Sequence, residues 1–133
     1  MKAAKAKLTR GLNHGSWIEP CDNSGAKKVR LISIIGAKTV RGRKPAAAIG
    51  DLCWVSVVKG TEAMRKQVVY AIVVRQRKSY RRPNGMRIKF EDNSVVILKD
   101  ERGNPKGTIF KGPIAKEAAE RWPPIAKVAS IVV

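Results

Sequence analysis

The sequence predicts a mainly β protein: a small closed or nearly closed β-barrel, preceded by a basic N-terminal arm and followed by a short C-terminal helical extension. Short segments rich in Val and Ile alternate with frequent turn signals, which is typical of small sandwiches and barrels. The length of 133 residues corresponds to one domain, and a hydrophobic content of 44% is sufficient for a packed core. Closure of the sheet would also remove the exposed edges of these strands.

Five or six short strands account for the middle of the chain. Asp22-Asn23-Ser24-Gly25 is a dense turn signal, and the apolar residues after it indicate a strand that Gly36 ends. A loop around Gly42 and Pro45 separates this strand from the next. In residues 86–90, apolar and cationic side chains alternate, as expected for a strand with one buried face. In chain order, we expect strands within residues 29–35, 51–60, 65–77, 86–90 and 95–100.

The two ends of the chain differ from this pattern. The first residues are basic with no clear period, which indicates an extended arm. The segment GPIAKEAAERW predicts one short helix that has Pro113 in its first turn and ends before Pro123-Pro124. The final AKVASIVV is expected to pack back as a strand or an irregular segment. The expected single domain is therefore 1–133, with the arm at 1–16, the barrel at 17–106 and the C-terminal extension at 107–133.

The charge of the chain narrows the classes of function. Twenty-eight Lys and Arg against ten Asp and Glu give a formal net charge of +18. Such self-repulsion destabilises a compact state unless a polyanionic partner neutralises it. Nucleic acid is the leading candidate for that partner, and an anionic membrane surface is the second. No apolar run approaches the roughly 20 residues that span a bilayer, and the basic N-terminus lacks the apolar segment of a secretory signal.

The basic residues gather in the arm and in two segments without any acid, residues 27–44 and 75–89. In the second segment, Pro83-Asn84-Gly85 predicts a tight hairpin turn with Gly85 at positive φ. Arg predominates there, and its planar fork matches phosphate oxygens. Tyr80 either stacks on a base or packs against the turn. The candidate nucleic-acid-binding residues are Lys2, Lys5, Lys7, Arg10, Lys27, Lys28, Arg41, Arg43, Lys44, Arg75, Arg77, Lys78, Arg81, Arg82 and Arg87.

Catalytic and metal-binding patterns are missing from the sequence. His14 is the only histidine and lies in the arm, and Lys59-Gly60-Thr61 reverses the order of a phosphate-binding P-loop. Cys21 and Cys53 have no CxxC neighbour, so a zinc site is not expected. Cys53 lies within an apolar run and is expected to be a buried thiol. We therefore expect no enzyme, no cofactor and no metal, in a reduced cytosolic protein.

Several motifs resemble the L-fourteen family of large-subunit ribosomal proteins. The family signature is similar to residues 71–97, and CDNSGAKKVRLISIIG and GTIFKGPIAKEAAERW also match the family, so the resemblance covers residues 18–133. The longer arm is similar to the archaeal and eukaryotic branch rather than to the shorter bacterial form. The matching signature residues are Ala71-Ile72-Val73-Val74, then Asn84-Gly85 after a basic spacer, then Phe90, Asn93 and Val96-Ile97.

The resemblance implies a five-stranded small β-barrel that is a structural constituent of the large subunit of the cytoplasmic ribosome. It implies direct binding of large-subunit rRNA, and a position at the subunit interface with bridges to small-subunit rRNA. It also implies contacts with ribosomal proteins L-three and L-twenty-four-e, and a C-terminal surface on which an anti-association initiation factor lands.

The mixed charge of the expected helix indicates a protein partner, because Glu117 and Glu120 would repel phosphate. Trp122 is either an anchor for that partner or a core residue. The residues expected on the partner surface are Lys116, Glu117, Glu120 and Trp122.

Two other functions compete with ribosomal RNA binding. The first is an independent single-strand-binding barrel, which needs exposed aromatic residues in a groove, whereas this chain is only 5% aromatic. The second is a basic module that binds protein alone. The salt dependence of binding distinguishes that module from the RNA-binding alternatives, because an affinity that rests on several phosphate contacts falls steeply as salt is added.

Overall fold

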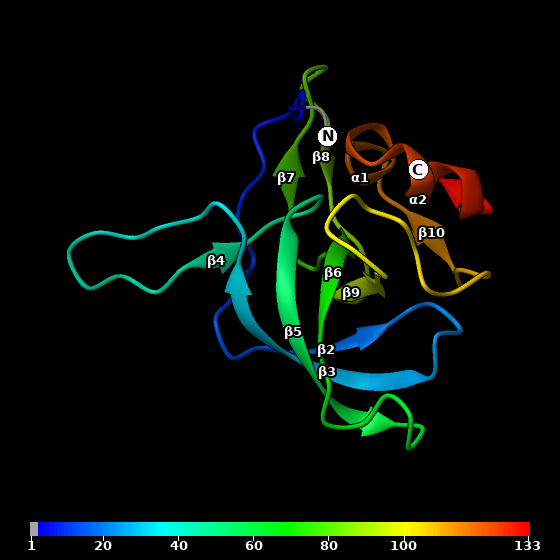
Figure 1. The fold of residues 1–133 in the computed structure, drawn as a ribbon. Coiled ribbons are helices and arrows are strands. Elements are labelled where there is room, and N and C mark those ends of the chain that lie inside the picture. The colour runs from blue at the N-terminus through cyan, green and yellow to red at the C-terminus, as the bar shows by residue number, and fades with distance from the viewer. Residues whose placement is uncertain (1–2) are drawn as a thin grey trace.

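A closed barrel of five strands forms the centre of the molecule (Figure 1). The structure, a computed structural model, describes residues 3–133. Neighbouring strands run antiparallel, except that β2 and β9 pair in parallel and close the barrel. In the order of pairing, the strands are β2 (Trp17–Pro20), β3 (Ala26–Ile34), β5 (Leu52–Gly60), β6 (Val68–Arg75) and β9 (Ser94–Ile97). The expected mainly β, five-stranded barrel is confirmed.

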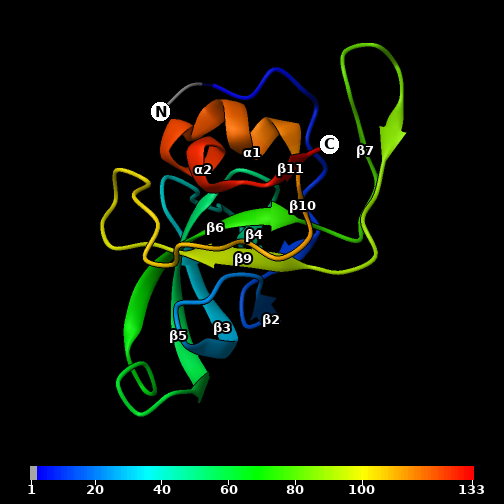
Figure 2. The ribbon, with the colours of Figure 1, turned by 90° about the vertical axis from the view of Figure 1, so that its right-hand side faces the viewer.

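The barrel strands differ in how many of their side chains are buried, depending on whether another segment covers their outer face. In β3 and β5, buried side chains such as Val29, Leu31 and Val55 alternate with more exposed ones, as expected for a sheet with one face toward the core. Residues 71–75 of β6 and all of β9 are buried. One reason is that α1 and β10 pack against β6 (Figure 2).

The C-terminal extension has more structure than the sequence predicted. Helix α1 (Lys116–Arg121) begins after Pro113, because Pro113 and Ile114 form strand β10 (Pro113–Ile114), which pairs in parallel with β11 (Ile131–Val132). A second helix, α2 (Pro123–Val128), was not predicted. Pro123 and Pro124 do end α1, but they also occupy the first turn of α2, where a missing N–H costs no hydrogen bond.

Two contacts fix this extension to the barrel side of the molecule. The Trp122 indole Nε1 donates to the carbonyl of Gly50 at 2.8 Å, and Arg121 pairs with Asp51 at 3.2 Å. Gly103 lets the chain pass close to the indole ring, since a Cβ there would lie 2.6 Å from Trp122 Cε3, and its φ is +95°. Trp122 is therefore a core residue.

The predicted turn is present, but it belongs to a hairpin outside the barrel. Strands β7 (Tyr80–Arg81) and β8 (Arg87–Ile88) pair with each other and project from the barrel (Figure 2). Gly85 has φ +88°, and its N–H donates to the carbonyl of Arg82 at 2.9 Å. The strand expected within residues 86–90 is present as β8, but it belongs to this hairpin, and the fifth strand of the barrel is β2.

The N-terminal segment is attached to the body of the protein. Strand β1 (Leu12–Asn13) pairs with β4 (Ala46–Ala47), and Leu12 is buried. Nearer the N-terminus, Lys7 forms a β-bridge with Arg81 of the hairpin. The sequence offered two leucines, Leu8 and Leu12, as a signal of this attachment.

Both cysteines are free and buried. The expectation for Cys53 is confirmed, and Cys21, whose position the sequence left open, is also inside. Burial raises the pKa of both thiols, so neither is a reactive thiolate near neutral pH.

Candidate nucleic-acid interface

Three basic segments that are distant in the sequence converge in the structure. In Figure 1 the loop of residues 36–45 projects to one side, the β7–β8 hairpin projects upward, and the N-terminal arm runs between them. The Gln76 amide, which is fully buried, donates to the carbonyl of Thr9 at 2.8 Å and to that of Lys78 at 3.0 Å. Gly11 lies against Lys78, and its N–H donates to Ala47 at the base of the loop.

The loop and the arm border an open cavity of about 500 Å³ whose lining is cationic. Arg10 of the arm faces the loop across it, and no acid contributes to the lining. The loop reverses direction through Arg41 and Gly42, both at positive φ. The cavity is lined by Arg10, Lys38, Thr39, Val40, Arg41, Arg43, Lys44 and Ala46. Guanidinium and ammonium groups that surround a common space are suited to binding phosphate oxygens.

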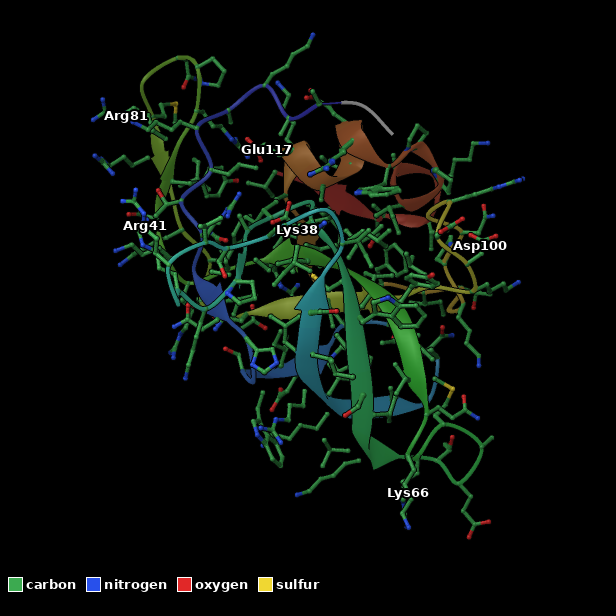
Figure 3. The ribbon with its side chains drawn as sticks, turned by 60° about the vertical axis from the view of Figure 1, so that its left-hand side comes forward. Lys38, Arg41, Lys66, Arg81, Asp100 and Glu117 are labelled. Carbon is green, nitrogen blue, oxygen red and sulfur yellow. The ribbon has the colours of Figure 1, made fainter. Side chains whose placement is uncertain are left out.

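The exposed cations of the hairpin extend this basic surface. We use the name loop–hairpin surface for the exposed cations of the arm, of the loop of residues 36–45 and of the hairpin together. In Figure 3, Arg41 and Arg81 project from the same edge of the molecule, and Asp100 lies at the opposite edge. The cationic side chains of the hairpin segment that are exposed are Arg77, Lys78, Arg81, Arg87 and Lys89. Positive charge is therefore concentrated on one side, which produces a strong local field.

Arg75 does not belong to this surface. Its side chain is buried, with Nε 3.0 Å from Asp92 Oδ1. Its Nη1 donates to the carbonyls of Lys111 and Pro113, at 2.9 and 3.1 Å. The guanidinium fastens the end of β6 to the segment that leads into β10, so its expected place on an RNA-binding surface is corrected: these partners occupy its donors.

Arg82 is also directed inward. Its Nε donates to Glu117 Oε1 at 2.8 Å, and its Nη2 donates to the carbonyl of Val133 at 2.5 Å. The Tyr80 hydroxyl donates to the other carboxylate oxygen of Glu117 at 2.8 Å. Tyr80 is fully buried, so of the two roles that the sequence left open it has the packing role, and it cannot stack on a base.

The expected partner surface on α1 is only half exposed. Glu117 and Trp122 are buried, at 6% and 3% exposure, because one bonds the hairpin and the other packs on the barrel side. Their placement on the surface is corrected. Lys116 and Glu120 are exposed and form an ion pair at 3.7 Å on the same helix.

The remaining cations that were predicted to bind nucleic acid lie either in the arm or at the start of β3. Lys5 and Lys7 are exposed in the arm, and Lys5 borders a groove between α1 and the hairpin tip. Lys27 and Lys28 lie at the far end of β3, away from the loop, where Lys28 is paired with Lys59 of β5. Lys2 lies outside the described residues.

The burial of Tyr80 predicts a dependence of stability on alkaline pH. Burial, together with the hydrogen bond and charge of Glu117, raises the pKa of the Tyr80 hydroxyl above its ordinary value. The folded state then retains a proton that the unfolded chain releases near pH ~10. We expect stability from this group below that pH and its progressive loss above it. Urea unfolding across this pH range should show a shallower alkaline decline in Tyr80→Phe than in the unsubstituted chain; equal slopes would contradict the assignment.

No group of three or more His, Cys, Asp or Glu side chains within residues 3–133 is arranged to hold a metal ion. No helix in the same range is long and apolar enough to cross a membrane.

The fold and the candidate site together describe a small closed β-barrel that presents segregated cationic loops. Comparison with known proteins makes this specific: the family described as ribosomal protein L14p/L23e matches residues 11–133, and the chain belongs to this family. Proteins called large ribosomal subunit protein uL14 are 52% identical in Halorubrum lacusprofundi, 50% in Halobacterium salinarum and 48% in Methanothrix thermoacetophila. Each alignment covers 100% of both chains.

Membership of this family identifies the chain as a structural, non-enzymatic protein of the large ribosomal subunit, a component of the cytoplasmic ribosome. The resemblance on which the sequence analysis relied is confirmed, including its assignment to the archaeal and eukaryotic branch by relatives that are archaeal.

Proposed function

We propose that the chain binds large-subunit rRNA directly through the loop–hairpin surface. The observation that carries this proposal is the cationic cavity between Arg10 and the loop of residues 36–45, which has no acid in its lining. The convergence of arm, loop and hairpin would let one rigid barrel contact several phosphates at once. Contacts of this kind respond to the shape of an A-form helix, because its deep and narrow groove hides the base edges.

The finer placement in the ribosome is part of the same proposal. The chain lies at the subunit interface, contributes to bridges with small-subunit rRNA, and contacts ribosomal proteins L-three and L-twenty-four-e. The exposed part of the C-terminal extension, including Lys116 and Glu120, receives the anti-association initiation factor. We also propose that residues 1–133 act as a single domain, which is supported by the packing of α1 and β10 on β6.

A salt titration tests the proposed RNA binding. The purified chain is mixed with a transcript of large-subunit rRNA, and the association constant is measured by filter binding at increasing salt. We expect the logarithm of this constant to fall linearly and steeply with the logarithm of salt concentration, because each neutralised phosphate releases counterions. An association that is independent of salt, or the absence of binding in dilute buffer, would contradict the proposal and favour a module that binds only protein.

A further inference from the structure

One aromatic residue is exposed in a place where barrel packing does not explain it. Trp17 in β2 is 51% exposed, whereas Trp122 is buried and the neighbouring Ile18 faces the core. Trp17 is the Cα partner of Arg30 on β3, so the two side chains stand on the outer face of the barrel. Neither the loop–hairpin surface nor the C-terminal extension includes this position.

The surroundings of Trp17 are predominantly cationic. The Lys28 ammonium lies 5.0 Å from the centroid of the indole ring. Arg30 is exposed and extends along the turn at Gly15, where a Cβ would be 3.7 Å from its Nη2. Within residues 3–133, neither Lys28 nor Arg30 forms an ion pair. Glu19, on the same strand, is the neighbouring acid, and it is outnumbered by Lys27, Lys28 and Arg30.

We propose that Trp17 is a stacking platform for an unpaired base of RNA, with Lys28 and Arg30 contacting the phosphates on either side of that base. Single-stranded RNA is bound by aromatic rings that stack on bases beside cationic groups that follow the backbone. Lys28 lies over the ring, and the exposure of Trp17 leaves the residue accessible to a ligand from solvent. The inference depends on the proposed rRNA binding and adds a second site to it, with an unpaired nucleotide as ligand.

The positive charge around Trp17 favours RNA over a protein as the ligand of this site. An exposed apolar side chain by itself has no such meaning: Ile109 is 61% exposed on the loop that leads to β10 and carries no proposal. At Trp17 the apolar ring and unpaired cations coincide on one sheet face. That combination matches the alternating planar bases and phosphates of a single strand.

The test compares Trp17→Leu with Trp17→Phe, and uses Ile109→Ala as a matched control at an exposed apolar site. Affinity for a large-subunit rRNA transcript is measured at fixed salt, after thermal unfolding has shown that the variants are folded. We expect Trp17→Leu to bind roughly 5- to 100-fold more weakly, which is the range for loss of one stacked base. Trp17→Phe should retain most of the affinity, and Ile109→Ala should bind normally.

The salt dependence provides a second readout. Trp17→Leu removes no charge and should leave the slope unchanged, whereas Lys28→Ala should make it shallower by about one phosphate contact. Normal binding by Trp17→Leu, or equal weakening by Trp17→Leu and Trp17→Phe, would overturn the stacking site while leaving the proposed rRNA binding intact. If the unsubstituted chain fails to bind RNA, the proposed function is wrong, and this inference is wrong with it.

Discussion

Replacement of Glu117 by alanine is expected to lower the free energy of unfolding by about 2–4 kcal/mol. The carboxylate accepts hydrogen bonds from Tyr80 and Arg82 in a buried position between α1 and the hairpin. Its removal leaves the buried Tyr80 hydroxyl and the Arg82 Nε without their acceptor, and such orphaned groups carry the cost of desolvation. Urea unfolding at neutral pH measures the change.

Glu120→Ala is the matched control for this substitution. Glu120 lies one turn further along α1, is exposed, and within residues 3–133 its ion-pair partner is Lys116 at the surface. A surface pair of this spacing contributes about 0.5 kcal/mol or less. If Glu117→Ala and Glu120→Ala have equally small effects, the buried cluster does not hold the hairpin to the C-terminal extension.

The burial of Glu117 with Tyr80 and Arg82 could not be predicted from the sequence. The segment KEAAER has mixed charge, and Glu117 was placed on a protein-binding surface because its carboxylate would repel phosphate. Its partners are Tyr80 and Arg82, 37 and 35 residues earlier in the chain. The barrel could be predicted because strand alternation and turn signals are local, but a buried carboxylate is recognised only when its distant partners are known.

The same distinction applies to the basic residues. A count along residues 75–89 treats Arg75, Arg77, Arg81 and Arg82 as equivalent ligands for RNA. The structure separates them: Arg77 and Arg81 are exposed, whereas Arg75 and Arg82 bond carboxylates and backbone carbonyls inside the protein. Replacing all four together would therefore mix a loss of RNA contacts with a loss of stability.

The convergence of the arm with the loop could not be predicted either. Its contacts are backbone pairings of short segments, such as β1 with β4, and they depend on small residues such as Gly11 and Ala47 that give no distinct pattern. The sequence showed residues 27–44 as one acid-free basic segment, and the length of β3 places Lys27 and Lys28 at the opposite end of that strand from the loop. Charge content was therefore predictable, and its partition into two surfaces was not.

Removal of four exposed cations from the loop should have the largest effect on RNA binding. In the variant with Lys38, Arg41, Arg43 and Lys44 replaced by Ala, we expect affinity for large-subunit rRNA to fall on the order of 10³-fold near 0.1 M salt. Each phosphate contact contributes about 0.7–0.9 to the slope of log affinity against log salt. The four substitutions should therefore make the slope shallower by about 3, as measured by filter binding.

A second variant with the same loss of charge separates a specific interface from general attraction. Arg65, Lys99, Lys111 and Lys127 are exposed, and they lie outside the loop–hairpin surface. Their joint replacement by Ala should reduce affinity less than about tenfold, since distant charges are largely screened at this ionic strength. The loop side chains bury little apolar surface, so both variants should melt near the unsubstituted chain. Equal losses of affinity in the two variants would mean that net charge alone attracts RNA and that the cavity beside Arg10 is not a binding site.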